Sequence, residues 1–368
     1  MVAPSGLRGR RPAAAPHLVR AAGRLAVLMA VAGLTLAACS SPSPSLKNGS
    51  LSIDTTTVPP TTPTTTAPTT TVPLPPAGAW SKAISLAPGV DLSVVSCPTA
   101  GFCVAGSATG QSYRLTGGKP STIGPVVSAP SPQGASFLSC TTATFCAAVP
   151  NLNQAALFNG TSWSAPTTIP GAQGFTAIGC VGTTFCVSID GEGNSFIYNG
   201  SRWSGNVGAW GAANQISCVN PSFCIAVEGG PSVWNGHAWS QPNDADPQGQ
   251  LNSVSCVSPT FCVAVDSSGA ALTWNGTAFS APAVVATEPP LTGTNASGLT
   301  SVSCASPTFC RAVDSIGRVF SFNGASWSAG TLIDQGGALT SVSCPSTSYC
   351  VAVDRHGQAY VSSGAPNS

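Results

Sequence analysis

The sequence predicts an all-β domain with the architecture of a seven-bladed β-propeller, and three observations predict it. A pattern with two cysteines six positions apart occurs seven times, and successive copies are 38 to 48 residues apart. Self-similarity at a period of about 40 residues is typical of repeat arrays. Each copy divides into four short segments with the residue alternation of strands, and no segment has helical periodicity. The last copy lacks its fourth segment, and a matching segment precedes the first copy.

The repeat at 251–285 shows how one blade is expected to fold. Residues 251–256 and 261–266 alternate between apolar and small or polar side chains and predict two strands joined by a tight turn. The stretch from Asp266 to Gly269 predicts a second turn, and residues 271–274 predict a third strand. Asn275-Gly276 is a strong hairpin signal because both turn positions favour positive φ, and it leads into a fourth strand over 277–285. Four antiparallel strands per repeat are typical of a propeller blade.

The two ends of the repeat array complement each other. The seventh copy stops where a Trp-Ser strand is expected, and Ala79-Trp80-Ser81 aligns with Ser326-Trp327-Ser328 of the sixth copy. We therefore expect the segment that begins at Ala79 to supply the outer strand of the last blade. This closure would remove an open sheet edge, which otherwise invites aggregation.

The first 78 residues are expected to lie outside the propeller, which covers 79–368. Residues 1–24 hold five arginines and no acid, and the apolar stretch that follows is too short for a membrane span. Residues 1–38 are therefore predicted to be a signal peptide. The sequence Leu-Ala-Ala-Cys at 36–39 resembles the bacterial lipobox, which implies cleavage and lipidation at Cys39; an ordinary cleavage site with a chance cysteine is the alternative. Residues 39–78 are rich in threonine and proline and predict an extended, disordered linker.

Charge and location restrict the partners. Without the arginines of the leader, eight basic residues remain against 12 acidic ones, so the mature chain lacks the basic surface that nucleic acid requires. The expected location is extracytoplasmic, on the outer face of the cell membrane, with the lipid anchor as the only membrane contact.

The paired cysteines are predicted to form one disulfide in each blade. In every copy the pair brackets a short turn between the first two strands, where facing residues lie close enough for a bridge. A metal site is not expected, because only His237 and His356 remain after cleavage and the spacing is not that of zinc ligands. A redox site would not be copied seven times, and no cofactor is predicted. The predicted pairs are Cys97 with Cys103, Cys140 with Cys146, Cys180 with Cys186, Cys218 with Cys224, Cys256 with Cys262, Cys304 with Cys310, and Cys344 with Cys350.

Other recurring residues are expected to serve packing. The residue before the first cysteine is serine in six copies and glycine in one, which suits the crowded strands nearest the axis. The residue before the second cysteine is phenylalanine or tyrosine and suits the space between neighbouring sheets. The aromatic residue after each Asn-Gly turn is expected to pack near the rim. Exposed tryptophans can bind sugars, but regular recurrence favours packing.

Five copies carry an acid four places after the second cysteine. Such an acid with a following glycine is typical of a turn whose carboxylate accepts backbone N–H groups. The alternative is a ligand-binding role, because these turns are expected on the same face as the variable connections between blades. A cation or a polar glycan would suit that face. The candidate ligand face comprises Asp190, Glu228, Asp266, Asp314 and Asp354 in the turns and Trp210, Asp244 and Asp246 in the connections.

The Val-Asp-x-x-Gly stretches resemble the Asp-box turns of sialidase-type propellers, although the glycine and tryptophan spacings differ. Residues 79–368, with their repeated SCxSxTFC…GxxWS unit, resemble secreted repeat lipoproteins of high-GC Gram-positive bacteria. They also have a distant likeness to WD and YVTN-type propellers, without a WD-repeat or kelch signature. The resemblance to sialidases would imply an arginine triad, a tyrosine nucleophile and acids, and no such grouping stands out among the five arginines of the domain. No catalytic residue is assigned. Two hypotheses follow: a non-catalytic recognition or scaffold module for a glycan, peptide or protein, and a glycan-directed hydrolase or lyase with its site on the variable face.

Overall fold

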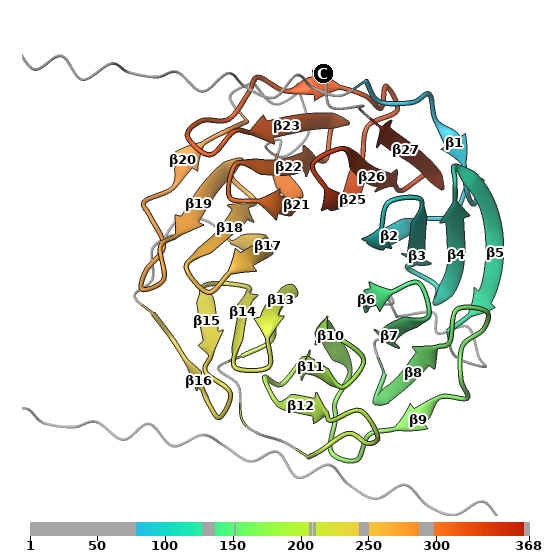
Figure 1. Ribbon diagram of the computed structural model, residues 1–368, viewed down its shortest axis with the longest axis vertical. Coiled ribbons are helices and arrows are strands. Elements are labelled where there is room, and N and C mark those ends of the chain that lie inside the picture. Colours follow the sequence, from blue (N-terminus) through green and yellow to red (C-terminus); the bar gives the residue numbers. More distant parts are fainter. Residues whose placement is uncertain are drawn as a thin grey trace, which may run out of the picture. The chain divides into compact units, whose positions relative to one another are not determined.

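The computed structural model shows seven β-sheets arranged in a ring (Figure 1), so the predicted seven-bladed propeller is confirmed. The structure describes residues 79–126, 137–150, 152–205, 208, 211–242, 250–286 and 298–363. These residues form strands, bridges and turns, and none of them forms a helix that could cross a membrane. The predicted signal peptide, Cys39 and the linker lie outside the described residues.

The first three blades follow one another around the ring, and each begins with its innermost strand. Blade 3 has three named strands, and a bridge between Tyr198 and Trp203 occupies its fourth position. The strands of blade 1 are β2 (Leu92–Thr99), β3 (Phe102–Ser107), β4 (Gln111–Thr116) and β5 (Lys119–Pro125); those of blade 2 are β6 (Phe137–Thr142), β7 (Phe145–Val149), β8 (Gln154–Phe158) and β9 (Thr167–Thr168); those of blade 3 are β10 (Phe175–Val181), β11 (Phe185–Asp190) and β12 (Ser195–Tyr198).

Blades 4 to 6 repeat this order, and blade 7 combines strands from both ends of the domain. The strands of blade 4 are β13 (Gln215–Asn220), β14 (Phe223–Val227), β15 (Pro231–Trp234) and β16 (Trp239–Ser240); those of blade 5 are β17 (Leu251–Ser258), β18 (Phe261–Asp266), β19 (Ala270–Trp274) and β20 (Ala283–Val284); those of blade 6 are β21 (Leu299–Ser306), β22 (Phe309–Asp314), β23 (Arg318–Phe322) and β24 (Thr331–Leu332); those of blade 7 are β25 (Leu339–Ser346), β26 (Tyr349–Asp354), β27 (Gln358–Ser363) and β1 (Ile84–Ser85).

The predicted closure by the N-terminal segment is confirmed. Trp80 forms a bridge with Ser362, and β1 then pairs antiparallel with β27 through Ile84 and Ala359. The Ser81 amide also donates to the Val361 carbonyl at 2.8 Å. Figure 1 shows β1 beside β27 at the outer edge of blade 7, where the blue and red ends of the colour scale meet. In blade 7, therefore, backbone hydrogen bonds and no turn join the outer strand to the inner three strands.

The hydrophobic core is divided into seven clusters, one at each boundary between neighbouring blades. The ring before the second cysteine contributes to these clusters as predicted; Phe309, for example, packs at the boundary between blades 6 and 7. The rim aromatics also reach the preceding blade. The Trp163 indole donates to Ser112 Oγ of blade 1 at 2.8 Å, and Trp239 donates to Ser195 Oγ of blade 3 at 3.1 Å. The aromatic repeats thus serve packing between sheets.

All seven predicted disulfides are present, and each joins the first two strands of a blade. The second cysteine of each pair is buried, with no more than 1% of its surface exposed. A loop this short reduces the entropy of the unfolded chain enough to stabilise the fold by about 2 kcal/mol per bridge in the chain-entropy model. So many disulfides indicate an oxidising, extracytoplasmic compartment.

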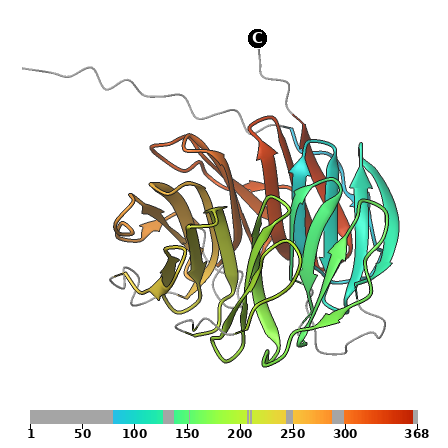
Figure 2. The ribbon, with the colours of Figure 1, turned by 60° about the horizontal axis from the view of Figure 1, so that its bottom comes forward.

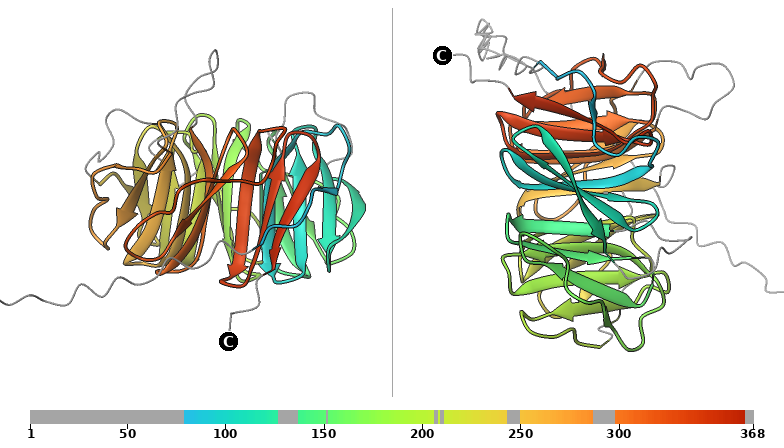
Figure 3. Two further views of the ribbon diagram at one scale, coloured as in Figure 1. Left: turned by 90° about the horizontal axis from the view of Figure 1, so that it is seen from above. Right: turned by 90° about the vertical axis from the view of Figure 1, so that its right-hand side faces the viewer.

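The turns and connections define two faces of the ring, which are seen edge-on in Figure 3. We call the face that carries the connections between blades the variable face. The turns between second and third strands also lie on it, because they bond to the connections. Ile333 N, for example, donates to Gly317 O, and Val285 N donates to Gly269 O, both at 2.9 Å. The tilted view in Figure 2 shows the strands of each blade running between these two faces.

Candidate functional site

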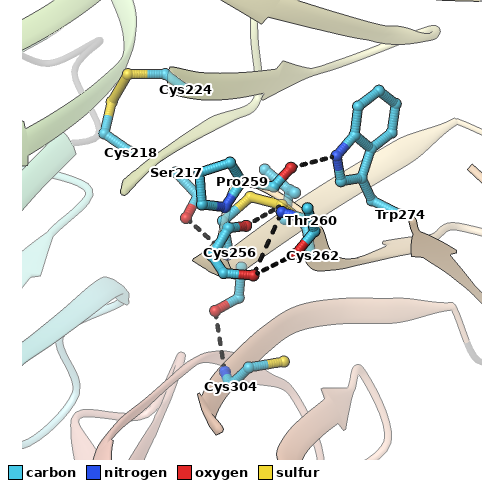
Figure 4. The surroundings of a disulfide bond; sticks show 12 residues. Ser217, Cys218, Cys224, Cys256, Pro259, Thr260, Cys262, Trp274 and Cys304 are labelled. Atoms are coloured by element: carbon cyan, nitrogen blue, oxygen red, sulfur yellow. Dashed lines mark hydrogen bonds between the residues drawn. A yellow bond between two sulfur atoms is a disulfide. The ribbon is translucent and has the colours of Figure 1, made fainter. Parts of the chain in front are cut away.

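Serine hydroxyls link the innermost strands around the axis. The serine before the first cysteine of one blade accepts the backbone N–H of the first cysteine in the next blade. Figure 4 shows one such contact, in which Ser217 Oγ accepts from Cys256 N at 2.9 Å, beside the disulfide of blade 5. The six contacts join Ser96 to Cys140, Ser139 to Cys180, Ser217 to Cys256, Ser255 to Cys304, Ser303 to Cys344, and Ser343 to Cys97.

This serine ring is interrupted at the boundary between blades 3 and 4, where Gly179 takes the place of serine. A Cβ atom at Gly179 would lie 2.9 Å from Ile216 Cγ2 and 3.2 Å from Cys218 Sγ, so the inner strands approach too closely there for a side chain. The sequence indicated only that this position must be small. The recurrence of serine rather than alanine was the available signal for a hydrogen-bonding role.

An axial pocket of about 120 Å³ lies where the innermost strands begin, and all seven blades line it. The first residues of these strands pair with the turns of the variable face, as Leu299 does with Asp314 and Leu339 with Asp354. The pocket therefore opens toward the variable face. Its lining comprises Ser93, Val94, Phe137, Leu138, Ala177, Ile178, Asn214, Gln215, Asn252, Ser253, Thr300, Ser301, Thr340 and Ser341.

The lining of the axial pocket is largely polar, and none of the described residues that line it has an ionisable side chain. Several polar groups bond to the neighbouring blade. Asn252 Nδ2 donates to Leu299 O at 2.8 Å, and Thr340 Oγ1 donates to Leu92 O at 2.6 Å. These bonds hold the lining in place while amide and hydroxyl oxygens remain as acceptors. The pocket thus suits neutral groups that donate hydrogen bonds, such as peptide N–H groups or sugar hydroxyls.

The acidic residues of the turns mainly stabilise the turns themselves by accepting backbone N–H groups, as the sequence pattern predicts. Asp190, Asp266, Asp314 and Asp354 are at most 1% exposed. In each of them, Oδ1 accepts the N–H groups two and four positions ahead. Glu228 is exposed on the variable face. Trp210, Asp244 and Asp246 lie outside the described residues, and none of the five acidic turn residues lines the axial pocket.

Blade 7 differs from the other acidic turns because a second buried carboxylate faces its aspartate. Asp334, in the connection from β24 to β25, is 4% exposed, and one ligand atom from each of Asp334, Asp354 and His356 lies within 4.8 Å of the others. Burial raises the pKa of Asp354, and the charge of Asp334 raises it further, against the opposing effect of the turn amides. Burial raises the pKa of Tyr360 beside them, and the charges of Asp334 and Asp354 and hydrogen bonding to these carboxylates raise it further.

Sequence reasoning placed a ligand on the variable face but missed the residues of the axial pocket and Asp334. The position four before the first cysteine was an available signal for the pocket. It is serine, threonine or asparagine in every copy, and in blades 1 and 4 to 7 this residue lines the pocket, although it precedes the motif that defines the repeat. Asp334 lies in a variable connection and has no counterpart that a comparison of repeats could align.

The fold is shared with known propellers, whereas no protein-family model and no curated protein match the chain. A structure titled "YCF48 bound to D1 peptide" is similar with a TM-score of 0.60 and 15% identity over 78% of this chain and 97% of that chain. The RRP9 WD40 repeats give a TM-score of 0.64 and 10% identity over 77% and 97%. The Neurospora crassa Pan2 WD40 domain gives a TM-score of 0.57 and 12% identity over 78% and 96%. At these identities the likeness concerns the fold alone.

Proposed function

We propose that the protein is a non-catalytic recognition module that binds a peptide or an exposed protein loop at the axial pocket of the variable face. The observation that supports this most is the lining of the pocket, to which every blade contributes and in which none of the described side chains is ionisable. Neutral hydrogen-bonding groups recognise amide groups without needing charge, and a pocket at the axis reads one ligand from seven directions. A structural neighbour whose title names a bound peptide adds support.

The proposal includes an extracytoplasmic, lipid-anchored location. The seven disulfides agree with an oxidising compartment. The lipobox-like sequence before Cys39 and the linker at 39–78 would hold the propeller away from the membrane, with the variable face free to meet a partner. Metabolic labelling with a fatty-acid analogue tests the anchor. Label should enter the wild-type chain, and a Cys39→Ala chain that still takes up label would contradict it.

The alternative of a glycan-directed hydrolase or lyase requires two carboxylates in an accessible pocket, about 5–10 Å apart. Asp334 and Asp354 are close together, but they are buried between blades 6 and 7, and neither lines the axial pocket. Among the described residues this pair favours a structural or ion-binding role over hydrolysis of a glycan. The recognition hypothesis is therefore the better supported one.

Binding to a random heptapeptide library and to a panel of neutral oligosaccharides tests the proposed function. Val94→Trp would fill the axial pocket, because Val94 lines it. Thr277→Trp is the matched control, because Thr277 is exposed on the Asn-Gly turn at the opposite face. We expect Val94→Trp to weaken the binding of selected peptides at least about tenfold, which corresponds to about 1.4 kcal/mol of binding free energy. The control variant should bind them as tightly as the wild-type protein. Equal binding by the two variants would overturn the proposal, and selective capture of oligosaccharides would replace the peptide with a glycan.

A further inference from the structure

The boundary between blades 6 and 7 brings three metal-ligating side chains together on the variable face. Asp334 comes from the connection before β25, Asp354 ends β26, and His356 lies in the turn that leads to β27. Their ligand atoms lie within 4.8 Å of one another, and His356 Nδ1 is 3.9 Å from Asp354 Oδ2. The two carboxylates are buried, while the His356 side chain is 59% exposed. The cluster thus has a buried acidic floor and an accessible imidazole.

The other acidic turns of the propeller show what is unusual here. In blade 6 the second carboxylate oxygen, Asp314 Oδ2, accepts from Arg318 Nε at 2.7 Å. In blade 5, Asp266 Oδ2 accepts from the Ser268 hydroxyl at 2.9 Å. In blade 3, Asp190 Oδ2 accepts from Asn194 Nδ2 at 3.1 Å. Each of these turns supplies its own partner for the second oxygen.

The second oxygens in blade 7 have no such partner in their turn, and the neighbouring polar groups are the Tyr360 hydroxyl and the His356 imidazole. Asp354 Oδ2 and Asp334 Oδ2 are both buried without a hydrogen-bond partner among the described residues. An ionised carboxylate oxygen that is removed from water without a partner is costly, and two facing carboxylates also repel each other. The fold nevertheless holds them together beside the exposed His356 imidazole, an arrangement that a bound cation would stabilise.

The backbone around Asp334 is fixed in place by the neighbouring turn. Asp334 N donates to Gly317 O at 3.2 Å, and Gly337 N donates to Asp334 O at 3.2 Å. A Cβ atom at Gly317 would lie 2.0 Å from Asp334 O, so only glycine permits this approach. Asp334 Oδ1 accepts from Gly336 N at 2.9 Å, which leaves Oδ2 directed to other groups. The Asp334 carboxylate is therefore held in position before any ion binds.

We propose that Asp334, Asp354 and His356 bind a divalent transition-metal ion that joins blades 6 and 7. Two carboxylate oxygens and one imidazole nitrogen form a mixed set that suits Zn²⁺ or Mn²⁺, whereas Ca²⁺ prefers six to eight oxygens. Water would complete the coordination. This inference is independent of the peptide-binding proposal.

Calorimetric titration of the purified full chain with ZnCl₂, after treatment with EDTA, tests the site. We expect one ion per chain and a higher melting temperature in the presence of zinc. Asp334→Asn keeps the oxygen that accepts from Gly336 N and removes the charge. It should weaken zinc binding by at least about 100-fold, because removing a residue that only hydrogen-bonds to a metal ligand already costs up to about 100-fold. His356→Ala should also weaken zinc binding. The His356 side chain is exposed, so its removal should leave the fold intact.

His237→Ala is the matched control, because His237 is the other described histidine and lies exposed on an Asn-Gly turn. It should leave zinc binding unchanged. Without metal, Asp334→Asn should raise the melting temperature, because it removes the repulsion between the carboxylates. Absence of zinc binding to the wild-type chain, or binding that survives Asp334→Asn, would overturn the proposal. A rise in melting temperature with Asp334→Asn and no effect of zinc would instead indicate that the carboxylates share a proton.

Discussion

The boundary between blades 5 and 6 and the boundary between blades 6 and 7 have the same strand arrangement but differ in their buried polar groups. At the first, Val263 packs with Cys310 and Phe320, and Asp314 pairs with Arg318, whose Nη2 alone lacks a partner. At the second, the atoms without partners among the described residues are Arg311 Nε and Nη1, Asp334 Oδ2 and Asp354 Oδ2. At the first boundary nearly all buried polar groups have hydrogen-bond partners. The propeller architecture therefore does not require the unpaired polar atoms at the second boundary.

Arg311 shows the difference at one repeated position. It lies between Phe309 and Val313, which both face blade 7, and its guanidinium lies 4.6 Å from the centre of the Phe309 ring. Arg311 is only 2% exposed, and burial lowers its pKa. The residues at the same position in the other blades are buried and aliphatic: Val104, Ala147, Val187, Ile225, Val263 and Val351. Groups that cost stability persist mainly at one boundary, which therefore is the place to look for a function beyond folding.

The largest expected effect comes from the two tryptophans that cover these boundaries. Trp80 packs at the boundary of blades 6 and 7, and Trp327 packs at that of blades 5 and 6. Replacing either by alanine should lower the free energy of unfolding by about 3 kcal/mol, the lower end for aromatic truncation, because both are only half-buried. Trp80 forms its bridge with Ser362 ahead of β1, and no turn joins this segment to the inner three strands of blade 7, so Trp80→Ala should also loosen the segment.

Hydrogen exchange distinguishes the two variants at matched amides. Ser81 follows Trp80, and Ser328 follows Trp327. Val361 N donates to Ser81 Oγ and Ser321 N donates to Ser328 Oγ, both at 3.0 Å. In Trp80→Ala the Val361 amide should lose protection, whereas in Trp327→Ala the Ser321 amide should stay protected. Equal loss at both sites would show that the split blade is no weaker than a continuous one.

A smaller effect of opposite sign is expected at Arg311. Arg311→Val introduces the residue of the equivalent position in blade 5 and should raise the free energy of unfolding by about 1–2 kcal/mol, because replacing a buried charge by a packed apolar side chain is often stabilising. Arg311→Met keeps the contact with Phe309 without the charge and should also stabilise. Denaturant unfolding measures both. Destabilisation by both variants would mean that the guanidinium itself holds the boundary together.

The smallest effect should be the same at both boundaries. Ser255 Oγ and Ser303 Oγ each accept a cysteine N–H of the next blade at 2.9 Å. Alanine at either position should cost about 1 kcal/mol, the typical value of one hydrogen bond. The two losses, measured by thermal unfolding, should agree within error because the inner strands repeat regularly. A clear difference between the two losses would show that the two boundaries also differ at their innermost strands, near the axis.

The fold was predictable because the repeat could be counted and its missing strand assigned to the segment at Trp80. The paired cysteines were also predictable, since their spacing and the compartment leave few alternatives. The serine ring was less accessible, because size alone explains the position and only the bonds between blades show why serine is preferred. Arg311 stood within the repeated motif, and its charge among aliphatic equivalents was a signal that the repeat pattern obscured. Asp334 was beyond reach, because its approach to Asp354 depends on how two blades pack.

The closing strand also determines how the domain responds to mechanical tension. A pull on the chain ahead of Ala79 reaches β1 before it reaches any hairpin that a disulfide closes. The bridge at Trp80 and the bonds from Ser81 to Val361 therefore carry the load first. Once they separate, the edge of β27 is exposed, while every inner hairpin remains unable to extend past its disulfide. Extension thus begins at blade 7 and leaves the other blades folded until the load passes to them.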